Sequence, residues 1–206
     1  MGTYDNLNEV QLDALKEIGN IGAGNACTAL SVLLGEPVDM TIPNLQFLDF
    51  DKTAEALGGK DHMVLGIKIN ITDDLNGMMF HIVQKPFAEK IINTYYKREL
   101  NSFEELDEMD SSVMNEMGNI TSGVYANSIA SLTGLQVNIT IPEQCCNTVG
   151  EILKIPQSMY SKLGERVLLV DEKYVIAGTE ISSNMIMILE EESLKTLFEK
   201  IGVASD

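Results

Sequence analysis

Residues 12–43 of the chain read LDALKEIGNIGAGNACTALSVLLGEPVDMTIP, and residues 111–142 read SSVMNEMGNITSGVYANSIASLTGLQVNITIP. The two stretches align without a gap at an offset of 99 residues and are identical at eleven of 32 positions. Because such a repeat marks a duplicated structural unit, the sequence predicts two related halves, about residues 8–100 and about residues 103–202. A half of that size buries little surface alone, so we expect both halves to share a single domain over residues 1–206.

The repeated stretch is expected to form a long amphipathic helix. Apolar residues recur at three- and four-residue steps from Asn8 to about Leu34, the spacing of one buried helix face. Asn6 or Asn8 is a suitable N-cap, and Gly35 is suited to end the helix. The predicted buried stripe consists of Leu12, Leu15, Ile18, Gly22, Ala26, Ala29, Leu30 and Leu33.

A β-hairpin and a second helix are predicted next in the first half. Strand-like runs cover residues 63–71 and 78–83, and the turn between them contains Asn76-Gly77, a strong hairpin signal. A helical pattern begins near Pro86, and proline suits the first turn of a helix because its missing N–H needs no partner there. The first half therefore reads helix, strand, hairpin and helix.

The second half repeats this order more loosely. Strand-like runs cover residues 166–170, 174–177 and 185–189, and a helical pattern ends the chain. Between the halves, residues 102–105 resemble a capping box at the start of a helix. The acidic residues within 104–110 are interpreted as a solvated face of that helix.

The charge balance excludes several classes of partner. The 206 residues include 14 Lys and Arg against 31 Asp and Glu, which gives a net charge of −17. Such a surface repels phosphate backbones and anionic lipids, so we expect neither nucleic acid nor a membrane as a partner. Cys27, Cys145 and Cys146 make a poor disulfide framework, and the N-terminus lacks a secretory signal. We therefore expect a cytoplasmic protein.

The histidines and cysteines give no support to metal or triad chemistry. His62 and His81 are the only histidines, they stand 19 residues apart, and no Cys or His spacing fits a zinc site. His81 lies in a strand-like apolar run, so we interpret it as a structural residue. The sequence therefore predicts neither a metal hydrolase nor a Ser-His-Asp enzyme.

A band of four residues recurs on the helix of each repeat. At 100° per residue, Asp13, Glu17, Asn20 and Gly24 lie along one helix face, away from the buried stripe. The second copy of the band consists of Ser112, Glu116, Asn119 and Gly123. One interpretation is a polar helix face whose glycines permit close helix packing. Against it, glycine inside a helix costs about 1 kcal/mol relative to alanine, and both copies keep Glu-x2-Asn while about two thirds of the aligned positions differ.

Glutamate and asparagine by themselves suit few reactions. A glycosidase needs two carboxyl groups, and asparagine is no general acid. A carboxamide can hold a water molecule through one acceptor and two donors. Positioning the attacking water is much of what phosphoryl hydrolysis requires when another molecule supplies the metal and the charge stabilisation. The glutamate could pair with a lysine of that molecule, and Gly24 and Gly123 would leave room for its backbone.

At these residues the chain resembles the CheC family of chemotaxis phosphatases, which is related to CheX and FliY. The family pattern is Asp/Ser-x3-Glu-x2-Asn-x22-Pro, and both copies match it completely, ending at Pro43 and Pro142. The resemblance covers essentially the whole chain. Its length and two-copy layout are similar to the CheC branch, since CheX is shorter and FliY carries an additional flagellar-switch domain.

The resemblance implies that the chain is a phosphatase that removes the aspartyl phosphate from the response regulator CheY. Asn20 and Asn119 would each orient a water molecule in line with the phosphate. Glu17 and Glu116 would pair with the regulator lysine that contacts the phosphoryl group. The regulator would supply the phosphorylated aspartate and the Mg²⁺, so the chain is expected to bind no metal or other cofactor of its own.

The resemblance also implies the fold and the surroundings of the sites. The implied fold is a pseudo-symmetric α/β (α+β) arrangement with one antiparallel sheet and two exposed site helices. Asp13 and Ser112 are expected to support the contact rim, and Pro43 and Pro142 are expected to turn the chain out of a strand. Many members of the family also bind CheD, a receptor-modifying deamidase, which makes CheD a candidate second partner.

Two other hypotheses use the same residues. A non-catalytic adaptor would bind phosphorylated CheY or CheD through the same duplicated helices, because docking alone also needs Glu-x2-Asn. A plain structural duplication would have no partner at this face. Phosphate release from the regulator separates the phosphatase from the adaptor.

Overall fold

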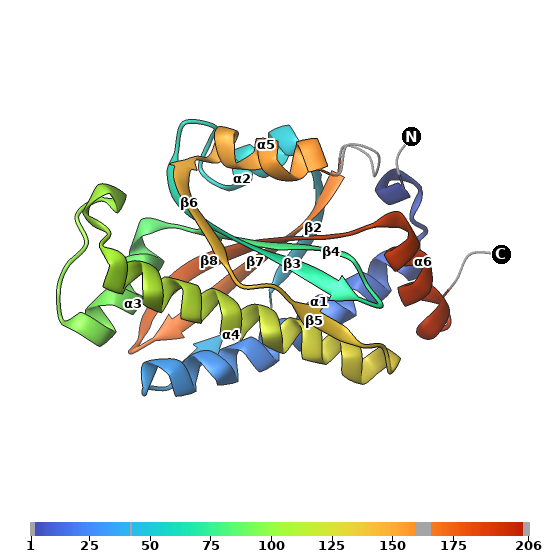
Figure 1. Cartoon of the computed structure of the whole chain (residues 1–206), viewed down its shortest axis with the longest axis horizontal. Helices are drawn as coiled ribbons and strands as arrows, with labels where there is room; N and C mark the ends of the chain where they lie inside the picture. The colour runs from blue at the N-terminus through green and yellow to red at the C-terminus, as the bar shows by residue number, and fades with distance from the viewer. Residues whose placement is uncertain (1–2, 42, 160–165, 204–206) are drawn as a thin grey trace.

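Two long helices of equal length form one side of the molecule. The structure, a computed structural model, describes residues 3–41, 43–159 and 166–203. Helix α1 (Glu9–Leu34) and helix α4 (Glu108–Thr133) are each 26 residues long and cross below the sheet in Figure 1. They run in opposite directions, so the start of each helix lies towards the end of the other (Figure 1).

Both helices begin with the same reciprocal cap, built from different residues. Asn8 Oδ1 accepts a hydrogen bond from the Gln11 N–H at 2.9 Å, and Gln11 Oε1 accepts one from the Asn8 N–H at 3.1 Å. Asp107 and Asp110 make the same pair of bonds at the start of α4, at 2.9 and 3.0 Å. Such caps satisfy N–H groups that the first helical turn leaves free. The predicted cap at Asn8 and the predicted end at Gly35, which has a φ of 66°, are confirmed.

In the described residues the strands form one eight-stranded sheet in which every pair is antiparallel. The strands are β1 (Val38–Met40), β2 (Asn44–Asp49), β3 (Met63–Asp73), β4 (Gly77–Val83), β5 (Val137–Ile139), β6 (Glu143–Thr148), β7 (Arg166–Ile176) and β8 (Thr179–Leu189). Their order is β1-β7-β8-β4-β3-β5, with β2 also paired to β7 and β6 also paired to β3. The predicted α+β fold with one antiparallel sheet is confirmed.

The two halves of the chain interleave in this sheet. β1 and β2 belong to the first half but pair with β7 of the second, and β5 and β6 of the second half pair with β3 of the first. β4 and β8 meet in the middle of the sheet, where His81 is opposite Met185. Pro43 lies between β1 and β2, and Pro142 lies between β5 and β6, where the chain leaves one strand and enters the next. Each half therefore completes the sheet of the other.

The shorter helices cover the rest of the sheet. α2 (Phe50–Ala56) and α5 (Val149–Met159) lie together on the side opposite α1 and α4, whereas α3 (Lys85–Tyr96) and α6 (Glu191–Lys200) lie at its two ends (Figure 1). Two short 3-10 turns, η1 (Thr3–Asn6) and η2 (Phe103–Glu105), complete the elements. In the part of the chain that the structure describes, none of the helices has the length and apolar character needed to cross a membrane.

The hairpin of the first half is as predicted, but the second half differs from its prediction. Residues 166–170 and 174–177, expected as separate strands, belong to the single strand β7 except for Ala177. The polar residues between them continue the ladder with β8 and do not turn. α2 and α5 were not predicted, because α2 has only seven residues and α5 contains Pro156, which normally argues against a helix.

The linker between the halves also corrects the sequence interpretation. Ser102 makes no side-chain cap hydrogen bond, and only the short turn η2 follows it, so the predicted capping box is wrong. The acidic stretch is no fully solvated face, since the side chain of Asp110 is buried and bonded to Arg98. A paired guanidinium is what allows a carboxylate to be buried at this position.

A buried carboxyl group lies between the helix pair and the sheet. The Tyr125 hydroxyl of α4 donates a 2.7 Å hydrogen bond to Glu172 Oε1 of β7, and Tyr174 also hydrogen-bonds Glu172. Burial raises the pKa of Glu172 from 4.5 to about 7, because the charged form loses its hydration. The carboxyl group is thus a proton-sensitive contact between α4 and the sheet.

A buried histidine also lies between α4 and the sheet. His81 Nε2 of β4 is 2.7 Å from Ser122 Oγ of α4, and the imidazole is only 2% exposed. Burial lowers its pKa from 6.5 to about 4, so the ring is neutral at neutral pH. This position supports the interpretation of His81 as a structural residue.

The two buried groups predict a pH dependence of stability. Glu172 contributes most stability below pH 4.5 and loses it as pH rises to about 7, whereas His81 loses stability as pH falls from 6.5 to about 4. Raising a carboxyl pKa from 4.5 to about 7 costs roughly 3 kcal/mol once the group is ionised. Glu172→Gln should therefore stabilise the protein by up to roughly 3 kcal/mol at pH 8 and by little at pH 4.5.

Urea unfolding at several pH values measures this effect. Glu199→Gln, which changes an exposed glutamate of α6, is the matched control and should leave the pH dependence unchanged. In Glu172→Gln only the His81 contribution remains, so stability should rise from pH 4 to 6.5 and then level off. An equal gain at pH 4.5 and pH 8 would contradict the assignment.

Candidate functional site

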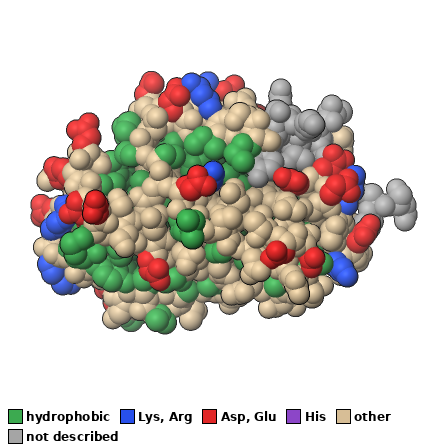
Figure 2. Space-filling model, viewed as in Figure 1, with side chains coloured by type: hydrophobic (Ala, Val, Ile, Leu, Met, Phe, Trp, Pro, Cys, Tyr) green, Lys and Arg blue, Asp and Glu red, His purple; other side chains and the backbone are tan. Residues whose placement is uncertain are grey.

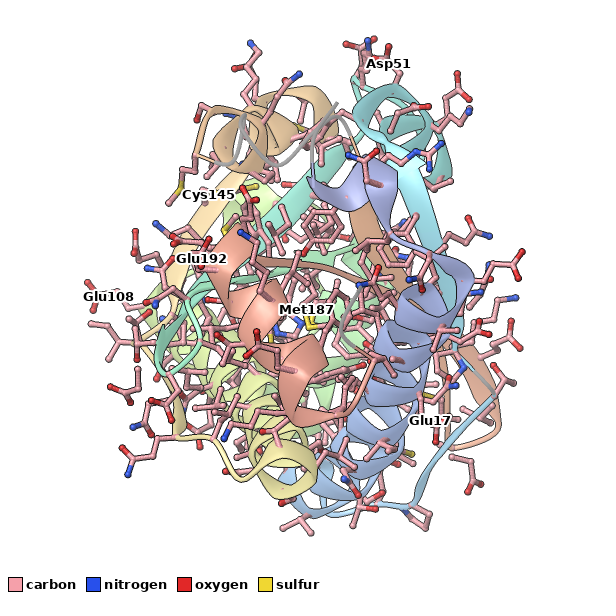
Figure 3. The ribbon with its side chains drawn as sticks, turned by 90° about the vertical axis from the view of Figure 1, so that its right-hand side faces the viewer. Glu17, Asp51, Glu108, Cys145, Met187 and Glu192 are labelled. Atoms are coloured by element: carbon pink, nitrogen blue, oxygen red, sulfur yellow. The ribbon has the colours of Figure 1, made fainter. Side chains whose placement is uncertain are left out.

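The band on α1 lies on the solvent side of the helix. Asp13, Glu17 and Gly24 are exposed, and Asn20 is half-buried. Because the helix is unbroken from Glu9 to Leu34, the Glu17 and Asn20 side chains are neighbours one turn apart. Figure 3 shows Glu17 on the outer helix α1, far from Asp51 on α2. The carboxylate of Glu17 is therefore free to meet another molecule.

Two details distinguish the individual residues of this first band. Asp13 Oδ1 lies 3.6 Å from Lys16 Nζ, an exposed i,i+3 ion pair of the kind that contributes little stability. Asn20 Oδ1 is buried and finds no hydrogen-bond partner among the described residues. A buried acceptor without a partner is costly. The Asn20 carboxamide would gain by rotating towards an incoming donor.

The band on α4 has the same order and is more open at its asparagine. Ser112, Glu116 and Asn119 are exposed, and Gly123 is half-buried. Asn119 differs from Asn20 in this exposure, so the two copies are similar in position but unequal in solvation. Sequence spacing alone predicts equal copies.

The glycines divide into a packed group and an open group. A Cβ atom added at Gly22 would overlap the Tyr125 ring, and one at Gly19 would overlap Leu45 of β2. A Cβ atom at Gly24 would meet nothing within 4 Å, and one at Gly123 would only touch Ile139 at 3.8 Å. The packing interpretation is therefore correct for Gly19 and Gly22, whereas the glycines of the two bands leave open space at the surface.

The structure does not merge the two bands into one site. At one end of the helix pair, the Tyr95 hydroxyl of α3 donates to the Leu33 carbonyl of α1 at 2.5 Å. The Tyr96 hydroxyl donates to the Met109 carbonyl of α4 at 3.2 Å. The end of α1 thus lies near the start of α4, so the two bands lie towards opposite ends of the pair. Each band is a separate candidate site.

Tyr95 of α3 is a neighbour of the second band that the sequence pattern does not indicate. Burial, together with the negative charge of Glu116, raises the pKa of Tyr95, so this half-exposed phenol lies within electrostatic reach of the second band. The sequence of α3 does not predict a contact with α4, so only the folded chain shows that Tyr95 lies near Glu116.

The described residues show no other constellation with an evident chemistry. No group of three or more His, Cys, Asp or Glu side chains among them is placed to hold a metal ion. On the face in Figure 2, Lys and Arg occur singly or in small groups among more numerous carboxylates. Each Glu-x2-Asn pair brings a carboxylate, which can attract a cation, beside a carboxamide, which can hydrogen-bond a water molecule.

Comparison with known proteins places this geometry in context. A model of the CheC-like family matches residues 10–45, which contain the whole first band. The chain is 32% identical over 208 residues to the CheY-P phosphatase CheC of Bacillus subtilis (strain 168), covering 99% of this chain and all of that protein. It is 29% identical over 139 residues to the flagellar motor switch phosphatase FliY of the same organism, covering 67% of this chain and 36% of FliY.

Solved structures show the same fold at lower identity. The crystal structure of Thermotoga maritima FliY matches with a TM-score of 0.70 at 22% identity, covering 97% of this chain and 100% of that one. A CheC-like superfamily protein from Shewanella sp. PV-4 matches with a TM-score of 0.53 at 11% identity, covering 89% and 99% of the two chains.

The two groups of glycines predict opposite effects of alanine. Gly24→Ala should raise the free energy of unfolding by about 1 kcal/mol, because alanine is the better helix former and nothing crowds the new methyl group. Gly22→Ala should lower it by about 1–3 kcal/mol, because the methyl group overlaps Tyr125 and forces the helices apart. Thermal and urea unfolding measure both. A loss of stability in Gly24→Ala would show that its surface is not open.

Proposed function

The chain belongs to the CheC-like family, and on that premise we propose that it is a phosphatase that dephosphorylates a phosphorylated CheY-type response regulator. The observation that carries the proposal is the pair of Glu-x2-Asn bands on the solvent side of helices α1 and α4, with exposed glutamates and with glycines that leave open space beside them. Support comes from the 32% identity, over 99% of this chain, to a relative named for CheY-P phosphatase activity.

In this proposal the asparagines position the attacking water. The carboxamide oxygen of Asn20 or Asn119 accepts a hydrogen bond from the water and its N–H₂ group donates to the acidic surroundings of the phosphate. Holding a nucleophile in line replaces an unfavourable encounter by a preformed geometry, which contributes much of the rate in phosphoryl transfer. The buried Oδ1 of Asn20, which has no hydrogen-bond partner among the described residues, supports this role, since an incoming water would satisfy it.

The glutamates in this proposal dock the regulator. Glu17 and Glu116 are exposed one turn before the asparagines, where a carboxylate can pair with a lysine of the regulator without being desolvated in advance. Gly24 and Gly123, one turn after the asparagines, admit the regulator backbone. Asp13 and Ser112 lie at the rim of the same bands.

In this proposal the chain only positions the water molecule, and the regulator supplies the other reactive groups. We assign the phosphorylated aspartate and the Mg²⁺ to the regulator and no cofactor to this chain. Family membership adds CheD as a candidate second partner. The competing hypothesis, a non-catalytic adaptor for phosphorylated CheY or CheD, uses the same docking face but leaves the rate of phosphate release unchanged.

Removing both carboxamides tests the catalytic role. Asn20→Ala combined with Asn119→Ala should reduce the acceleration of phosphate loss from phosphorylated CheY by about 100-fold or more, because the water is no longer held in line. Each single variant should keep part of the activity. Phosphate release from CheY labelled with acetyl phosphate measures the rates.

Asn44→Ala is the control for this experiment, because Asn44 is an exposed asparagine at the start of β2, outside both bands. It should be as active as the wild type. A double variant with full activity would show that the carboxamides do not position the water. A wild type that binds phosphorylated CheY without changing its rate would establish the adaptor.

Neutralising the glutamates tests docking separately from catalysis. Glu17→Gln combined with Glu116→Gln should raise the KM for phosphorylated CheY about tenfold with a smaller effect on kcat, because it removes the charge-assisted contact at whichever band the regulator docks. The dependence of KM on salt should become weaker in this variant. A change in kcat alone would assign the glutamates to the chemical step.

A further inference from the structure

A groove lies between α1 and α4 on the outer surface of the helix pair. Its volume is about 510 Å³, and residues of both helices line it. Ile21, Asn25 and Val32 line it from α1, and Val124, Asn127 and Leu132 line it from α4. Ile21 and Asn25 each directly follow a residue of the first band, and Val124 directly follows Gly123 of the second. The groove therefore lies beside both candidate sites, lined by residues that are next to band residues in the sequence.

The two asparagines are close together relative to the size of a protein partner. The helices cross where Gly22 abuts Tyr125 and where the Asn25 carboxamide donates to Ser128 Oγ at 3.1 Å. Asn20 precedes these contacts by two to five residues, and Asn119 precedes them by six to nine. At 1.5 Å per residue the asparagines are about 12–21 Å apart along the antiparallel pair.

Each band also lies beside the far end of the other helix. Val32 follows the crossing on α1 and so lies at the end of the pair that holds Asn119. Leu132 follows it on α4 and lies at the end that holds Asn20. Both are large apolar side chains left exposed, Val32 by 80% and Leu132 by 47%. A partner docked on either band therefore contacts residues of both helices.

The footprint of a protein partner is larger than this spacing. An interface of ordinary size covers about 800 Å² on each partner, which corresponds to a disc of about 16 Å radius. With helix axes about 8–10 Å apart, the asparagines are about 14–23 Å from each other. Two such discs avoid overlap only when their centres are about 32 Å apart. Even a small transient interface of about 600 Å² per partner needs about 28 Å.

We propose that the two sites are mutually exclusive: the chain binds one phosphorylated regulator at a time, at either band, and the groove between α1 and α4 is part of the docking surface in both positions. This inference rests on the proposed function. The duplication then gives a regulator two alternative docking sites, but the chain still binds only one regulator molecule. For two equal sites the association constant is twice that of one site.

The stoichiometry of the complex tests this exclusion. The probe is CheY carrying beryllium fluoride as a stable mimic of its phosphoryl group, titrated into this chain by calorimetry, with the mass of the complex measured by light scattering. The wild type should bind one CheY per chain. A variant with Glu17→Ala and Asn20→Ala, and another with Glu116→Ala and Asn119→Ala, should each also bind one.

The binding constants make the test quantitative. For exclusive sites, the association constants of the two single-site variants add up to that of the wild type, whether or not the sites are equal. Two CheY molecules per wild-type chain would overturn the exclusion and leave the phosphatase proposal intact. If one variant lost all binding and the other bound like the wild type, the proposal would also be overturned, because only one band would then bind CheY. Absence of binding to the wild type would overturn the proposed function itself.

Variants in the groove test its part in docking. Val32→Glu, made in the variant that retains only the Asn119 site, should weaken binding of the beryllium fluoride form of CheY at least tenfold. Met159→Glu, an equally drastic change at an exposed residue of α5 on the other side of the sheet, should leave the affinity unchanged. Equal affinities of both variants would overturn the shared docking surface.

Discussion

The close contact between α1 and α4 is the constraint on which the rest of the structure depends. Gly22 has no side chain, and the Tyr125 ring occupies the space that a Cβ atom would need. The antiparallel crossing places one face of each helix on the sheet and leaves the opposite face in water. Tyr125 then reaches Glu172 of β7 with a 2.7 Å hydrogen bond and connects the crossing to the sheet. A shift of either helix would disturb the packing, the buried hydrogen bonds and the spacing of the sites together.

Interleaving of the strands explains why the duplicated halves act as one body. β7 of the second half pairs with β1 and β2 of the first half, and β3 of the first half pairs with β5 and β6 of the second. The helices that bear the bands therefore rest on a sheet to which both halves contribute. Rigid helices on a shared sheet suit a site whose function is to hold a water molecule and a docking carboxylate at a set distance. Nothing in this arrangement requires the chain itself to supply a nucleophile.

Local rules predicted the elements whose stabilising contacts lie close together in the sequence. The cap at Asn8, the end at Gly35 and the hairpin around Asn76-Gly77 all depend on contacts between residues a few positions apart. The failures involve distant partners. Asp110 is buried because Arg98 pairs with it, and the polar centre of β7 remains a strand because β8 lies beside it. α5 tolerates Pro156 within a packed layer, which no local pattern shows.

The sequence by itself determined the repeat, the helical spacing of Glu17 and Asn20 and of their copies, and the family, because these depend only on the order of residues along one helix. Only the tertiary structure decided that Gly22 packs while Gly24 stays open, that Asn20 is less solvated than Asn119, and that Tyr95 lies near Glu116. The distance between the bands also comes from the fold alone. It depends on where two helices cross, and that point is set by side chains 103 residues apart in the chain.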